Sequence, residues 1–257
     1  MNKEVFSMLK KILISIGVVF VIFASIIGYF VYKDLKQEEV LKKEIIDLSN
    51  KDLLQDNFNI SVKTTGDYAY VENAIKKFYK ELSDSVKKLN YSLNDDDLIN
   101  ILSVDNLQSD RPNFIKSHAL LSSAKKQSTE ALDKISLLCN EEYIKNLLDK
   151  DKVSDYYTNF YQQLMYTESD LKYFRETKES MEELSHNINL FLDKVDEILK
   201  MLERNNDSWF IENGQIYFSS GDLVEEYNNL YKELKDIANE KLNTEQYTNP
   251  SHSQASV

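Results

Sequence analysis

The chain has 257 residues and a formal net charge of −12, with 43 acidic side chains against 31 Lys and Arg. This balance disfavours nucleic acid as a partner, because a phosphate backbone requires a basic face. The single cysteine, Cys139, excludes an intramolecular disulfide. Only five Gly and two Pro are present, and this scarcity of turn residues favours a few long helices.

The first feature along the chain is an apolar segment, Ile12 to Tyr32, that contains no charged side chain. Lys10 and Lys11 precede it, and Lys33 follows. As an α-helix the segment would be about 31 Å long, which matches the hydrocarbon core of a bilayer. We therefore expect a single-pass transmembrane helix over 12–32. A cleaved signal peptide is the alternative, although its apolar region would be shorter, at about 7–15 residues.

Lysines flank this segment on both sides, so the positive-inside rule does not decide its orientation. Residues 1–11 form a short leader, and long domains translocate largely regardless of charge. We therefore expect the C-terminal domain to lie outside the cytoplasm. Many Lys and only three Arg are typical of an AT-rich bacterial genome, which makes a bacterial cell membrane the expected location.

Three regions are expected after the membrane segment. Residues 33–56 continue the membrane helix as a helical stalk, and residues 57–242 form a helical domain that begins with an extended connector. The polar residues 243–257 form a disordered tail.

Within the domain, apolar residues recur in steps of three and four, which predicts helices. Two long helices are expected over 67–90 and 113–138, and two short ones over 94–103 and 140–148, with Asn94 and Asn140 as caps. The strongest signal is typical of a coiled-coil seam. It comprises Met181, Leu184, Ile188, Phe191, Val195, Ile198 and Leu202. One helix of nearly 50 residues, starting at Ser154, would include this seam.

After the seam, the spacing of the apolar residues changes from that of a helix to that of strands. Residues 209–218 predict two short strands joined at Asn213-Gly214, the pair most typical of a type I′ turn. Such a hairpin is marginal alone, so it should pack on the helices through Trp209 or Phe210 and through Phe218. Asp222 and Glu225 predict a capping box for a last helix over 223–240. The fold class is therefore mostly all-α: an elongated helical bundle with one small hairpin.

Metal and phosphate sites have weak support. Glu183 and His186 have the Glu-x-x-His spacing of di-iron bundles, but the seam places both on the outer face of their helix. The acidic run 94–97 lacks the spacing of a calcium loop, and no glycine-rich phosphate loop is present. We expect no cofactor and no metal.

Catalytic residues are equally hard to assign. Three Ser-x-x-Lys pairs begin at Ser85, Ser122 and Ser123, but chance matches are expected in a chain so rich in both residues. Cys139 lies beside an apolar helix face and should be an inert thiol. His118 borders the core and should be packed. We therefore expect that the chain is not an enzyme.

Aromatic side chains gather between Tyr156 and Phe174, more densely than one helical stripe requires. Tyr157, Tyr161 and Tyr166 would lie to the side of the buried face and could form a partner or ligand surface. Packing against neighbouring helices is the alternative for all three.

The sequence thus predicts a non-catalytic, membrane-anchored interaction or scaffold protein of the bacterial envelope. Its expected partners are the lipid bilayer, through residues 12–32, and a protein or a second copy of the chain. The alternatives are an extracytoplasmic, sensor-like bundle that binds a ligand at the tyrosines, and an envelope hydrolase. The hydrolase would need polar groups converging in a cleft, for example around His118.

Overall fold

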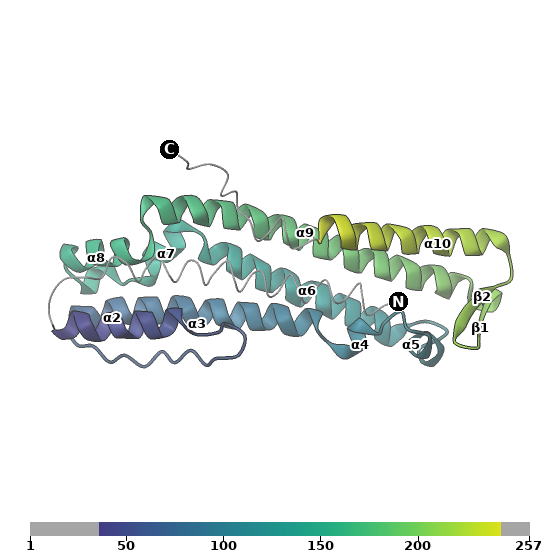
Figure 1. Ribbon diagram of the computed structural model, residues 1–257, viewed down its shortest axis with the longest axis horizontal. Coiled ribbons are helices and arrows are strands. Elements are labelled where there is room, and N and C mark those ends of the chain that lie inside the picture. The colour runs from purple at the N-terminus through teal and green to yellow at the C-terminus, as the bar shows by residue number, and fades with distance from the viewer. Residues whose placement is uncertain (1–35, 243–257) are drawn as a thin grey trace. The chain divides into compact units, whose positions relative to one another are not determined.

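The computed structural model describes residues 36–242 (Figure 1). The predicted membrane segment 12–32, the leader 1–11 and the tail 243–257 lie outside the described residues. Within 36–242, no helix is both long enough and apolar enough to cross a membrane. The anchor at 12–32 therefore stays a prediction.

The fold is mostly helical and carries a two-stranded antiparallel hairpin near the C-terminus, as predicted. The helices are α2 (Lys36–Ser49), α3 (Asp67–Leu93), α4 (Asp96–Ile99), α5 (Val104–Ser109), α6 (Ile115–Leu138), α7 (Glu141–Leu147), α8 (Asp155–Met165), α9 (Glu168–Arg204) and α10 (Gly221–Asp236). The strands are β1 (Trp209–Glu212) and β2 (Gln215–Phe218). Short 3-10 turns span Lys150–Lys152 and Asn206–Ser208, and a π turn, Ile237–Lys241, follows α10.

The described chain divides into two compact units. Unit 1 contains residues 89–130 and 183–242, and unit 2 contains residues 36–88 and 131–182. The long helices α3, α6 and α9 each contribute residues to both units. Each unit is therefore assembled from segments that are distant in the sequence.

Unit 2 is built around the apolar face of α3, which is buried as its spacing predicts. Val71, Ile75 and Phe78 are each at most 1% exposed. A group of buried charges lies beside this face. Lys76 Nζ lies 2.6 Å from Glu72 Oε1 and 2.7 Å from Glu44 Oε2 on α2. This contact holds α2 alongside α3, as Figure 1 shows.

The structure of residues 36–56 differs from the helical stalk predicted over 33–56. Its helix, α2, ends at Ser49, and the chain continues as turns and extended backbone up to Gly66. Leu41, Ile45 and Leu48 are at most 5% exposed, because their spacing of four and three aligns them on one face. Residues 36–49 are therefore packed within unit 2 instead of standing in solvent.

The core of unit 1 uses the predicted seam of α9. Leu184, Ile188, Phe191, Val195, Ile198 and Leu202 are all at most 1% exposed. Helix α10 lies alongside this part of α9 (Figure 1), and two ion pairs join them. Lys194 Nζ lies 2.7 Å from Glu233 Oε2, and Arg204 lies 3.2 Å from Glu226.

The single helix of nearly 50 residues that the sequence allowed from Ser154 is instead two, because α8 ends at Met165 and α9 begins at Glu168. Thr167 and Asp170 stabilise the new helix start reciprocally. The Thr167 hydroxyl accepts a bond from the Asp170 amide at 3.3 Å, and the Asp170 carboxylate accepts one from the Thr167 amide at 2.8 Å. This exchange has the geometry of a capping box, which satisfies helix-terminal donors.

Two other helix starts also differ from the prediction. Asp95, not Asn94, caps α4, and the predicted helix 94–103 is only α4, which the short helix α5 follows. Helix α10 begins at Gly221 with Ser220 as its cap, so the predicted Asp222 capping box is wrong. The Asn140 cap of α7 is confirmed, since its side chain accepts from the Tyr143 amide.

The hairpin has the predicted bounds and turn. Trp209 pairs with Phe218 and Phe210 with Tyr217 in the register. Asn213 and Gly214 both have positive φ, +51° and +72°, as a type I′ turn requires. Of the two predicted alternatives for packing, Trp209 is the buried one, at 3% exposed.

Candidate functional site

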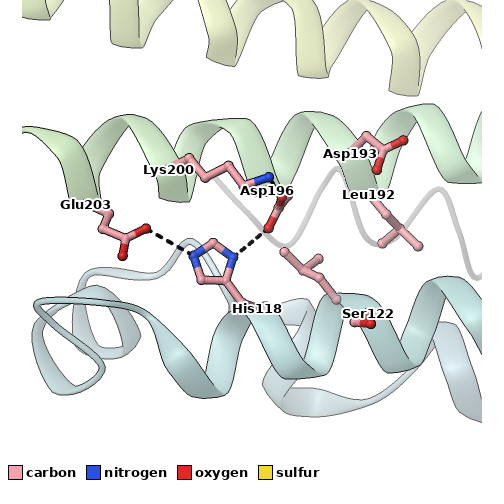
Figure 2. Close-up of a pocket in the computed structure, with 8 residues that line it drawn as sticks. His118, Ser122, Leu192, Asp193, Asp196, Lys200 and Glu203 are labelled. Carbon is pink, nitrogen blue, oxygen red and sulfur yellow. Dashed lines mark hydrogen bonds and ion pairs between the residues drawn. The ribbon is translucent and has the colours of Figure 1, made fainter.

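A groove of about 430 Å³ lies between α6 and α9 within unit 1 (Figure 2). Polar side chains from both helices line it, together with two leucines. The lining residues are His118, Leu121, Ser122, Leu192, Asp193, Asp196, Lys200 and Glu203.

The helical repeat explains why these residues meet. His118, Leu121 and Ser122 are three or four positions apart on α6, so they share one face. On α9 the groove residues 192, 193, 196, 200 and 203 follow the same spacing and flank the buried seam. The groove is therefore the polar margin of a helix–helix packing interface.

His118 lies between two carboxylates of α9. Its Nδ1 is 2.6 Å from Asp196 Oδ1, and its Nε2 is 3.6 Å from Glu203 Oε2. The side chains of His118 and Asp196 are 26% and 25% exposed, so solvent reaches both. The ring therefore bridges two carboxylates of α9, one at each nitrogen.

Asp196 has a second cationic partner. Lys200 Nζ lies 2.6 Å from Asp196 Oδ2, one helical turn along α9. Burial would raise the pKa of Asp196, but the hydrogen bonds from Lys200 and His118 outweigh it and lower that pKa below its ordinary value. The carboxylate is therefore held ionised between two donors.

The other charged residues of the groove are paired as well. Asp193 Oδ1 accepts from Lys125 Nζ of α6 at 2.7 Å. The groove thus contains a network in which carboxylates of α9 meet cations from both helices. Such a network joins α6 to α9, and its members largely neutralise one another.

A hydrolytic triad needs a nucleophile hydrogen-bonded to the histidine. A triad consists of a nucleophile, a histidine and an acid. The groove contains a histidine and an acid in contact, His118 and Asp196, and Ser122 lies on the same face of α6 as His118. Among residues 36–242, however, no hydrogen bond joins Ser122 to His118. The second ring nitrogen faces Glu203 instead, as Figure 2 shows. The geometry is that of an ion-pair network at the surface of the helix pair.

The three tyrosines predicted as a partner or ligand surface belong to unit 2, whereas the groove residues belong to unit 1. Tyr161 is fully buried and its hydroxyl donates to the Ile144 carbonyl at 2.9 Å. Tyr166 is 2% exposed and its ring lies 5.8 Å from that of Tyr161. Tyr157 is half-buried and packs edge-on against Tyr68 at 4.8 Å. The alternative, packing against neighbouring helices, therefore describes Tyr161 and Tyr166.

The remaining sequence candidates are accounted for by local contacts. Glu183 and His186 lie exposed on α9. Cys139 is buried, and this burial raises the pKa of its thiol to about 12, which disfavours the reactive thiolate. Ser85 donates to the Glu81 carbonyl of its own helix. Lys126, the partner of Ser123 in the motif, lies 4.0 Å from Glu130.

The sequence identified His118 but not its partners. Asp196 is 78 positions away, and its contact with His118 depends on how α6 packs on α9. The sequence signal that could have indicated these partners is the row of charged residues that runs beside the seam of α9 at helical spacing. Solvated helix faces show the same pattern, so this signal is not specific.

Comparison with known proteins yields no relative for this chain: no family model, no curated protein and no solved structure matches it.

Proposed function

We propose that this chain is a non-catalytic, membrane-anchored interaction protein of the bacterial envelope. The observation that carries the proposal is the uncharged segment Ile12 to Tyr32, whose length as a helix suits a bilayer span. The helical domain that follows would be held at the membrane outside the cytoplasm, where it contacts a partner protein or another copy.

The groove supports a non-catalytic role. His118 has a carboxylate at each ring nitrogen, and Lys200 and Lys125 are engaged by Asp196 and Asp193. A general base needs a free nitrogen within reach of the group that it deprotonates. Pairing of this kind instead stabilises the contact between two helices.

Fractionation of cells that express the full chain tests the anchor. We expect the protein to stay with membranes after an alkaline carbonate wash. The variant Val21→Asp/Ile22→Asp should leave them, because each acidic residue at the centre of a span costs about 2.5–3.5 kcal/mol. As a control, Val21→Leu/Ile22→Leu should stay. Recovery of the unaltered chain in the soluble fraction would refute the anchor.

Topology and partner capture test the rest of the proposal. Alkaline phosphatase fused at the C-terminus should be active, since this enzyme requires export from the cytoplasm. The detergent-solubilised full chain should self-associate or retain a specific protein from envelope extracts. An inactive fusion would reverse the orientation, and absence of both association and capture would oppose the interaction role.

A sensor-like, ligand-binding function is the second candidate, and the groove is the observation that favours it. A zwitterionic ligand such as an amino acid could place its ammonium at Glu203 and its carboxylate at Lys200. Thermal-shift measurements of the full chain with the common amino acids test this. A shift that disappears in Lys200→Met and persists in the control Lys172→Met, a lysine that lies outside the groove, would favour the sensor.

The envelope hydrolase has a direct test too. A fluorophosphonate probe labels activated serines, so we expect no labelling of the full chain. Labelling that disappears in Ser122→Ala and persists in Ser123→Ala would support the hydrolase instead.

A further inference from the structure

The outer face of the β1–β2 hairpin exposes two stacked aromatic rings. The strand alternation directs Trp209 inward and its neighbour Phe210 outward, and the register places Tyr217 opposite Phe210. The rings of Phe210 and Tyr217 lie 5.5 Å apart at 15°, and the two residues are 50% and 39% exposed. Large rings at this exposure on a two-stranded sheet are typical of a contact surface.

The inner side of the hairpin is held firmly within unit 1. The indole N–H of Trp209 donates to the Leu202 carbonyl at 2.8 Å. The ring of Trp209 stacks on Phe114 at 6.3 Å, and the Arg111 guanidinium lies 4.1 Å from its centre. The outer rings therefore rest on a well-anchored strand pair, which reduces the entropy lost on binding.

The sequence around these rings is strongly acidic. Residues 205–231 contain five carboxylates and no Lys or Arg. Glu226 is paired with Arg204. The other four, Asp207, Glu212, Asp222 and Glu225, are exposed, and none forms an ion pair within the described residues 36–242. Glu212 shares the outer face with Phe210 and Tyr217, since strand residues alternate.

The strands also offer backbone groups. Within 36–242, no backbone hydrogen bond reaches β1 or β2 from outside the hairpin. A two-stranded sheet has two outer edges, whose N–H and C=O groups can pair with an extended segment of another chain.

We propose that this hairpin face, formed by Phe210, Tyr217 and Glu212, binds a basic extended segment of a partner protein. Lys or Arg side chains would lie over the two rings as cation–π contacts and next to the Glu212 carboxylate, and the other carboxylates of residues 205–231 would add to the attraction. The same carboxylates would be repelled by anionic lipid headgroups, so a protein segment suits the face better than a membrane surface. This inference rests on the interaction role proposed above and gives the chemistry of the partner.

The test uses the purified full chain in neutral detergent and a fluorescein-labelled peptide of alternating arginine and threonine. Fluorescence anisotropy should show saturable binding that weakens with salt, and the matching glutamate–threonine peptide should not bind. Phe210→Ala/Tyr217→Ala should weaken binding about ten-fold, given about 2–5-fold per exposed cation–π contact. Glu212→Gln should weaken it about two- to three-fold and reduce the salt dependence.

Matched controls separate this face from general attraction to an acidic protein. Tyr91→Ala removes another exposed ring of unit 1, and Glu183→Gln removes another exposed carboxylate, which forms no ion pair among residues 36–242. Both should bind as the unaltered chain does, and far-UV circular dichroism should show all variants folded. Equal weakening by the controls, or no saturable binding, would overturn the proposal, as would binding to anionic vesicles in place of the peptide. Failure of the membrane fractionation would refute the anchor alone, because the peptide assay does not depend on it.

Discussion

Lys76 offers the sharpest test of how unit 2 is held together. Its ammonium is 3% exposed and contacts Glu72, Glu44 and the Ser61 carbonyl at 2.6–2.7 Å. Lys76→Met keeps the chain length but leaves two buried carboxylates without this cation. Breaking a buried ion pair from one side costs about 3–5 kcal/mol. For a chain of this size, the unfolding midpoint should fall by about 6–20 °C, at roughly 2–4 °C per kcal/mol.

The pH dependence of this loss has a definite sign. Burial would raise the pKa of Glu72 and of Glu44, but hydrogen bonds from Lys76 and from Thr64 or Lys63 outweigh it and lower both values. A lowered pKa in the folded state stabilises the protein above the ordinary value, near 4.5, and this contribution disappears as pH falls through the folded value. In Lys76→Met the buried carboxylates favour protonation, so the difference from the unaltered chain should shrink towards pH 4.

Urea unfolding followed by circular dichroism at 222 nm, at pH 7 and pH 4, measures both effects. Lys63→Met is the matched control, since Lys63 contacts the same Glu44 from a side chain that is 59% exposed. Solvent screening makes such a contact weak, so the control should lose much less stability. If Lys76→Met costs no more than Lys63→Met at pH 7, or costs more at pH 4 than at pH 7, the reasoning is wrong.

Three further predictions concern single contacts. Asp196→Asn should destabilise the chain by about 1 kcal/mol at pH 7. Because the pKa of Asp196 is lowered in the folded state, the difference should shrink in urea melts as pH falls below the ordinary value of 3.8, and a constant difference would count against the pairing. Gly214→Ala should cost about 1–2 kcal/mol, since Gly214 has φ +72°. Thermal melts measure this loss, and Gly221→Ala is the control. Gly221 has open space around it and no positive φ, so its substitution should cost nothing measurable, and equal losses in the two variants would contradict the turn geometry. Tyr161→Phe should cost about 1 kcal/mol by removing the donor to the Ile144 carbonyl, and an unchanged urea midpoint would show that this bond adds no stability.

Local periodicity was sufficient for much of the fold. The steps of three and four that define the faces of α3 and α9 directly set which side chains are buried, and Asn213-Gly214 sets the hairpin turn. Helix ends were less predictable, because several residues near each terminus can act as caps. Asp95 and Ser220 are the caps in the structure, one and two positions from the residues that the sequence favoured.

The candidate site was predictable only in part. His118 stood out as the histidine at the edge of a core face, but its spacing on α6 carries no information about α9. At Tyr161 and Tyr166 the helical phase suggested a lateral position, with packing against neighbouring helices as the alternative. Packing among α7, α8 and the chain between α8 and α9 buries both rings. The spacing of apolar residues along a single helix cannot predict such a contact with another segment.

The sequence by itself determined the helical class, the buried faces, the hairpin with its turn, and an uncharged segment long enough to span a bilayer. These are local properties, since they follow from the period of apolar residues and from the backbone preferences of single residues. The tertiary structure decided the rest: the packing of α2 into unit 2, the pairing of His118 with Asp196, and the choice of Trp209 over Phe210 as the buried ring. Each of these depends on which distant segment is adjacent, and adjacency is set by the packing of whole helices.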